Sequence, residues 1–175
     1  MRNLIGCLSA MMMLLAVVSC VNSKHAKNYN DMVDGNTSSF IKQGLENSET
    51  GIKASKLAQT ASKNTRVINF AQMVVTDNDG ISDDLQKFAI ADKITGGDSV
   101  SATHLATITD LNNYSGVKFD KAYLTTMITG HQDAIKLFTA AKADNNEDIK
   151  KFANKTLPIL QAHLDSATAI AASLK

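Results

Sequence analysis

Apolar residues recur every three or four positions along four long stretches of the chain, the spacing of a helix with one buried face. This pattern predicts helices over about residues 36–62, 65–92, 118–143 and 147–174. The repeating positions are Ile41, Leu45 and Ile52; Val67, Phe70, Val74, Ile81, Leu85 and Phe88; Phe119, Tyr123, Met127, Ala134 and Phe138; and Ile149, Phe152, Leu160, Ala167, Ile170 and Leu174. The alternation typical of strands is almost missing, so the sequence predicts an all-α protein.

The lengths of the links predict how the helices are connected. The links at residues 63–64 and 144–146 are tight, and tight links make consecutive helices antiparallel neighbours. The link at residues 93–117 is long, is interrupted by Gly96 and Gly97, and carries a short helical pattern around Ile108. Such a link either carries the chain along the bundle, as in a ferritin-like four-helix bundle with one long crossover, or makes an excursion at one end.

The first 20 residues have the layout of a secretory signal. Arg2 precedes an apolar run at residues 4–18 that is too short to span a bilayer stably. The run ends in Val17-Val18-Ser19-Cys20, which resembles the lipobox of bacterial lipoproteins, in which the cysteine is acylated and becomes the new N-terminus. We therefore expect a signal peptide at residues 1–19, a lipid on Cys20, a polar flexible tether at residues 20–35 and one domain at residues 36–175.

Charge and cysteine content narrow the range of partners. The chain has 18 basic and 17 acidic residues, and loss of Arg2 with the signal peptide makes the mature chain neutral. A neutral chain has no field that attracts nucleic acid, so no nucleic-acid partner is expected. Cys7 leaves with the signal peptide and Cys20 is acylated, so no disulfide is expected.

Each predicted helix places one polar residue within its apolar stripe. These residues are Glu49 between Leu45 and Ile52, Asn78 between Val74 and Ile81, His131 between Met127 and Ala134, and His163 between Leu160 and Ala167. Counted from the tight turns, the first three lie level and His163 lies about three residues further, roughly 4.5 Å along a helix. The spacing therefore predicts one polar cluster at the middle of the bundle.

Two interpretations of this cluster follow from its chemistry. Glu49, His131 and His163 offer a carboxylate and two imidazoles, ligands that bind a divalent transition metal, with Asn78 beside them as a poor fourth ligand. Alternatively the four side chains satisfy one another as a buried hydrogen-bonded network. The Glu-x-x-His motif of di-iron bundles is not present, because Ile128 and Leu160 stand three residues before the histidines.

Several motifs of this chain resemble those of the bacterial domain-of-unknown-function family 4142. They are Glu49-Thr50-Gly51 within residues 40–57, Val67 with Phe70-Ala71 and Met73, Thr76-Asp77-Asn78, Phe119-Asp120 with Tyr123, Met127 and His131, Phe152-Ala153, and Leu157-Pro158 with His163-Leu164. The resemblance covers nearly all of residues 36–175. It implies a ferritin-like fold in a secreted or lipid-anchored protein of no settled activity. The family usually has Asp-His where this chain has Asp77-Asn78.

The sequence contains no glycine-rich phosphate loop, no Cys-x-x-Cys and no nucleophile motif. His104 lies on the crossover, where we expect an exposed side chain. The sequence therefore favours a non-enzymatic lipoprotein, anchored to the outer membrane on its periplasmic side, that binds a protein partner or a small ligand. The alternative is a metal-binding or redox bundle that uses Glu49, His131 and His163.

Overall fold

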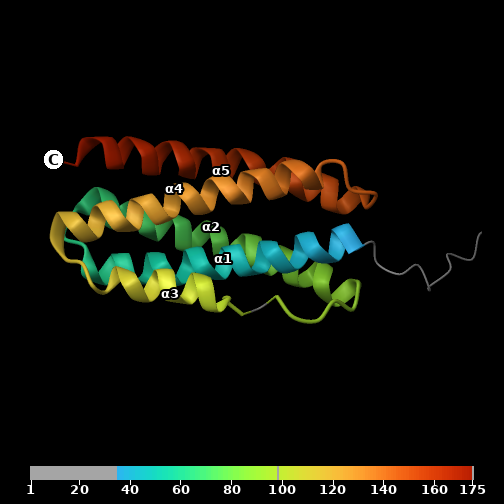
Figure 1. Ribbon diagram of the computed structural model, residues 1–175. Coiled ribbons are helices and arrows are strands. Elements are labelled where there is room, and N and C mark those ends of the chain that lie inside the picture. Colours follow the sequence, from blue (N-terminus) through green and yellow to red (C-terminus); the bar gives the residue numbers. More distant parts are fainter. Residues whose placement is uncertain (1–34, 98, 175) are drawn as a thin grey trace, which may run out of the picture. The chain divides into compact units, whose positions relative to one another are not determined.

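Five helices form the part of the chain that this computed structural model describes, residues 35–97 and 99–174, and none of those residues is in a strand (Figure 1). They are α1 (Gly35–Ala61), α2 (Thr65–Ala91), α3 (Ala102–Leu111), α4 (Gly116–Ala141) and α5 (Glu147–Ser173). The all-α prediction is confirmed. The predicted signal peptide, Cys20 and nearly all of the tether lie outside the described residues. Within those residues, none of the helices combines the length and the apolar character that crossing a bilayer requires.

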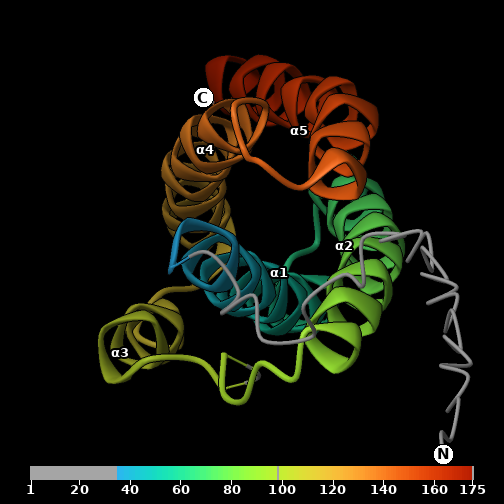
Figure 2. The same ribbon diagram turned by 90° about the vertical axis from the view of Figure 1, so that its right-hand side faces the viewer.

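The four long helices form a bundle with one long crossover. α1 packs against α2 and α4, and α5 packs against the same two helices, so α2 and α4 lie diagonally across the bundle. Figure 1 shows α2 and α4 running in the same direction, because the link between them carries the chain back along the bundle. Figure 2 shows α3, the short helix of that link, outside the ring of four helices. The crossover prediction is confirmed, and the excursion at one end is not observed.

The helix starts follow from local side-chain chemistry. The Asn64 side chain caps α2 by accepting a hydrogen bond from the backbone N–H of Arg66, and Asn146 caps α5 by accepting from Asp148 and Ile149. These caps explain why the chain turns where the tight links were predicted. α5 continues through Pro158 as one helix.

A polar layer divides the core into two apolar clusters. One cluster includes Val74, Met127 and Ala167, and the other includes Ile81, Ala134 and Leu160. On each of the three helices that carry these residues, the buried residue between the two clusters is polar: Asn78 is 6% exposed, His131 6% and His163 1%. The prediction that polar side chains point into the core at the middle of the bundle is therefore confirmed for these three residues.

The crossover depends on two glycines with left-handed backbone angles. Gly96 has a φ of 80° and Gly97 has a φ of 99°, a region that residues with a Cβ atom rarely adopt. At Gly97 a Cβ would also lie 2.7 Å from the Cα of Lys42, whereas at Gly96 it would meet nothing within 4 Å. The chain therefore passes close to the backbone of α1 at Gly97.

The two glycines provide a matched test of this close approach. We expect Gly96→Ala to lower the free energy of unfolding by about 1 kcal/mol, because only the backbone angle is strained. Gly97→Ala should lower it by about 1–3 kcal/mol more, because the crossover must also move away from Lys42. Urea unfolding followed by circular dichroism measures both values. Equal losses would contradict the close packing of the crossover on α1.

Candidate functional site

The polar layer contains a chain of hydrogen bonds that joins three helices. Asp77 of α2 contacts His163 of α5, with 2.8 Å between Oδ2 and Nε2. The Nδ1 atom of His163 lies 3.1 Å from Nε2 of His131 on α4. The Nδ1 atom of His131 lies 2.7 Å from the backbone carbonyl oxygen of Met127, one turn earlier in α4. The chain therefore runs from an aspartate at the surface to a carbonyl inside the bundle.

The Met127 carbonyl fixes the direction of the hydrogen bonds. A carbonyl only accepts, so Nδ1 of His131 carries a proton. Burial lowers the pKa of His131 to about 4, opposed by the hydrogen bond to Met127 and assisted by the nearby His163, so the ring is neutral at pH 7. Nε2 of His131 then has a lone pair and accepts the proton that Nδ1 of His163 donates.

The same logic places a further proton between His163 and Asp77. Because Nδ1 of His163 is a donor, Nε2 of a neutral His163 would be an acceptor and could not bond an ionised carboxylate. The 2.8 Å contact therefore needs one proton, carried either by the imidazole as an ion pair or by the carboxyl group. His163 is 1% exposed and the Asp77 side chain 38% exposed, so this proton lies at the boundary between core and solvent.

Glu49 does not join this chain, and the prediction that it faces the histidines is wrong. Its side chain is 33% exposed and forms a salt bridge of 2.8 Å with Lys53 on the same helix. The residue of α1 that is buried near this level is Ser48, whose backbone carbonyl accepts a hydrogen bond of 3.4 Å from the Asn78 amide. The carboxylate that reaches the histidines is that of Asp77.

The error has a geometric cause. Between two apolar residues seven positions apart, the third and the fourth positions both turn towards the same face of a helix. Ser48 and Glu49 both satisfy this spacing between Leu45 and Ile52, and Asp77 and Asn78 satisfy it between the equivalent residues of α2. The spacing in the sequence is therefore compatible with either member of each pair facing the core. Packing against the neighbouring helices decides which one is buried.

Glu49, His131 and His163 are not brought together as one group of side chains. Among the residues that the structure describes, no group of three His, Cys, Asp or Glu side chains is placed to hold a metal ion. Each histidine also uses both ring nitrogens in hydrogen bonds within the protein. Metal binding by Glu49, His131 and His163 stays a prediction that this arrangement does not support.

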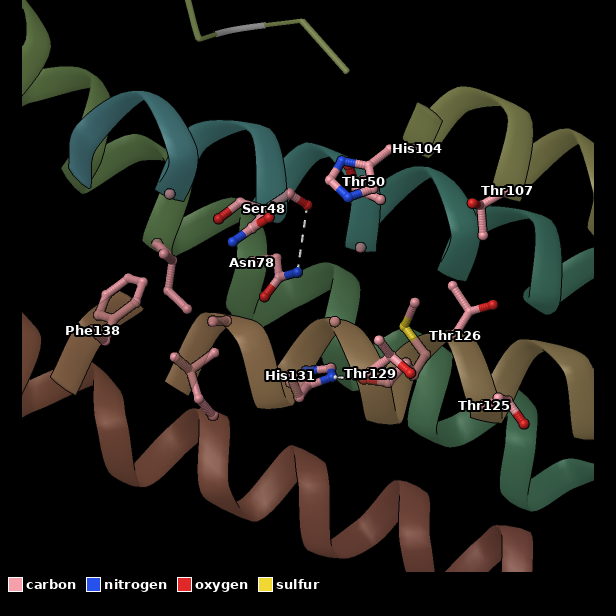
Figure 3. A pocket seen from close by; sticks show the side chains of 18 residues that line it. Ser48, Thr50, Asn78, His104, Thr107, Thr125, Thr126, Thr129, His131 and Phe138 are labelled. Carbon is pink, nitrogen blue, oxygen red and sulfur yellow. Dashed lines mark hydrogen bonds between the residues drawn. The ribbon is translucent and has the colours of Figure 1, made fainter. Parts of the chain in front are cut away.

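A cavity of about 280 Å³ lies beside His131, bounded by α1, α3 and α4 with α2 and α5 at its floor (Figure 3). We call it the interhelix cavity. Its lining has no Asp, Glu, Lys or Arg. Gly44 and Gly51 of α1 and Gly130 of α4 are part of its wall. A Cβ at Gly44 or Gly51 would meet Leu85 or Asn78 of α2, so these two glycines let side chains of α2 pack close to α1, whereas a Cβ at Gly130 would meet nothing within 4 Å.

Hydrogen bonds close α1 onto α4 on both sides of the interhelix cavity. The Thr37 hydroxyl donates to the Asp144 carboxylate at 2.9 Å, beyond the end of α4. Towards the other end of the bundle, the Ser62 hydroxyl donates to Asp120 at 2.6 Å, and Ser55 and Tyr123 share a hydrogen bond of 2.8 Å. The two helices are therefore joined at their ends and separated in the middle.

The crossover is fastened to α1 over this cavity. One carboxylate oxygen of Glu46 accepts from the backbone N–H of Ser101 at 3.1 Å and contacts Nδ1 of His104 at 2.7 Å. The hydrogen bonds to Ser101 lower the pKa of Glu46, against the effect of burial, and His104 adds to them. The His104 side chain stays 42% exposed in this contact, in line with the exposed side chain that the sequence predicted.

Comparison with known proteins gives one match. The sequence model described as "Domain of unknown function (DUF4142)" matches residues 22–170. That range includes the whole hydrogen-bond chain and every residue that lines the interhelix cavity. The searches of curated proteins and of solved structures returned no match.

The lowered pKa of His131 predicts a pH dependence of stability. An exposed histidine titrates near about 6.5, so between that pH and about 4 the unfolded chain binds more protons than the folded chain. The free energy of unfolding should therefore fall as the pH falls through this window, by up to about 3 kcal/mol. Urea unfolding at pH 7.0 and pH 4.5 measures the loss. His131→Gln should show a loss smaller by about 2 kcal/mol, and parallel losses would contradict the assignment.

The shared proton predicts different effects for two substitutions of Asp77. Asp77→Asn supplies an amide N–H that donates to a neutral His163, so we expect a cost below about 1 kcal/mol at pH 7. Asp77→Leu leaves a buried ring nitrogen without a partner and should cost about 1–3 kcal/mol. Urea unfolding measures both, and ¹⁵N spectra of the imidazoles should show one fixed neutral tautomer of His163 in Asp77→Asn. A greater loss in Asp77→Asn than in Asp77→Leu would contradict the donor assignment.

Proposed function

This chain belongs to the DUF4142 family, and we propose that it is a lipid-anchored protein of the bacterial cell envelope whose helical bundle acts by binding rather than by catalysis. The anchor in this proposal is Cys20, which follows the apolar run at residues 4–18. The location that this sequence supports is the periplasmic side of the outer membrane. More than one acyl chain on Cys20 would make the attachment durable.

One observation supports binding rather than catalysis: the ring nitrogens of both buried histidines are consumed inside the protein. General acid–base catalysis needs a nitrogen within hydrogen-bond reach of the reacting group. Nδ1 of His131 is occupied by Met127, Nε2 of His131 by His163, and Nε2 of His163 by Asp77. These histidines therefore serve the architecture, and the interhelix cavity is left as a place for a ligand.

The neutral charge of the mature chain is consistent with an anchor that depends on lipid. A protein that binds a membrane electrostatically needs a cluster of basic residues near the surface. Here the basic and acidic residues balance once Arg2 is removed. Attachment therefore depends on the acyl chains of Cys20 alone in this proposal.

The two cysteines of the sequence provide a matched test of the anchor. We expect cells grown with a clickable fatty-acid analogue to label the wild-type protein and the Cys7→Ser variant, because Cys7 leaves with the signal peptide. Cys20→Ser should lose the label and move from the membrane fraction to the soluble fraction, since no acyl chain remains. In-gel fluorescence and fractionation give both results. Labelling that persists in Cys20→Ser, or that depends on Cys7, would refute the anchor.

A further inference from the structure

Asn78 has an unused hydrogen-bonding group deep in the interhelix cavity. Its side chain is 6% exposed, and its amide nitrogen donates to the Ser48 carbonyl at 3.4 Å. Its Oδ1 atom makes no hydrogen bond with the residues that the structure describes. That atom is not fully enclosed by the protein, so it opens onto the cavity. A Cβ atom at Gly51 would overlap the amide nitrogen, so the glycine makes room for this side chain. Buried amides are normally paired, and this one faces a cavity (Figure 3).

Several other polar groups of the wall already donate hydrogen bonds within the protein. The hydroxyl of Thr50 donates to the carbonyl of Glu46 at 2.7 Å, one turn earlier in the same helix. The hydroxyls of three further lining threonines donate in the same way at 2.8–3.2 Å; they are Thr107, Thr125 and Thr126. His131 has no free ring nitrogen. Asn47, His104 and Thr129 also line the wall but are more exposed than Asn78. We therefore take the buried Asn78 carboxamide as the group that a ligand would pair with.

The rest of the floor is apolar and uncharged. Five buried apolar side chains form it, and they are Ile81, Met127, Ala134, Phe138 and Leu160. Benzene enters an apolar protein cavity of roughly 150 Å³, so a cavity of about 280 Å³ has room for a substituted six-membered ring. A charged ligand would lose its hydration with no Asp, Glu, Lys or Arg in the wall to compensate its charge, which is costly.

We infer that the interhelix cavity is a binding site for a small uncharged molecule with an apolar body and one amide or hydroxyl group that hydrogen-bonds to Asn78. The apolar body packs against Phe138 and the side chains around it, and the polar group faces the Asn78 carboxamide. This inference rests on the proposed function, because it specifies what the bundle binds.

Four probes of similar size test the ligand class. They are benzamide, toluene, benzoate and benzylammonium, titrated into the Cys20→Ser chain at pH 7 without detergent and followed by ¹⁵N chemical shifts. Benzamide should bind about five to ten times more tightly than toluene, because it adds a hydrogen bond at a buried amide. Neither charged probe should bind, since the wall holds no counter-charge.

Three variants assign the binding to this cavity. Gly130→Leu fills the wall and should abolish the binding of both benzamide and toluene. Gly80→Leu is the control, because Gly80 is also helical, lies outside the cavity wall, and likewise has nothing within 4 Å of an added Cβ. Asn78→Leu is close in volume to the wild-type residue and should reduce benzamide binding to the level of toluene while toluene still binds. Retained toluene binding shows that the variant is folded.

Several results would overturn the inference. They are a failure of all four probes to bind, charged probes that bind as well as benzamide, equal binding of benzamide and toluene to the Cys20→Ser chain, and unchanged affinities when Gly130→Leu is added to that chain. The acylation of Cys20 is read separately in cells, so loss of the ligand site would leave the anchor standing, and loss of the anchor would leave the ligand site standing.

Discussion

The need to satisfy two buried imidazoles constrains the whole bundle. His131 and His163 have four ring nitrogens in a region that water scarcely reaches, and each nitrogen must have a partner of the right kind. Asp77 and the Met127 carbonyl close the two ends of the chain, which links α2, α5 and α4. A shift of any of these helices by one turn, about 5.4 Å, would break the chain. The polar layer therefore fixes the positions of α2, α4 and α5 along their axes relative to one another. Apolar contacts alone would define these positions less strictly.

α1 contributes to the bundle in a different way. It has no member in the histidine chain, and at that level it presents Ser48 and Gly51 instead of a large side chain. Hydrogen bonds at its ends hold it to α4, while its middle stands apart. The interhelix cavity is a consequence of this arrangement, and the crossover is fastened over it by Glu46. The histidine hydrogen-bond chain joins α2, α4 and α5, and the cavity lies between α1 and α4.

Periodicity was sufficient to predict the four long helices, and the short links were sufficient to predict the two tight turns. Apolar residues at helical spacing, asparagine caps before α2 and α5, and two tight turns are local features, and local features are written directly in the sequence. The length of the link at residues 93–117 allowed two paths. In the structure the chain runs along the bundle: Gly97 passes close to Lys42 of α1, and Glu46 of α1 then binds Ser101 and His104 of the crossover.

The sequence by itself determined that polar side chains occur in the middle of the bundle. On α1 and on α2 it offered two adjacent positions, either of which could face the core. Only the tertiary structure decided that Ser48 turns inward and Glu49 pairs with Lys53, and that Asp77 reaches His163. The reason is the helical repeat of 3.6 residues, which places the third and fourth positions on either side of the same face. Which of them becomes buried depends on the neighbouring helix, and that neighbour is set by contacts between residues far apart in the chain.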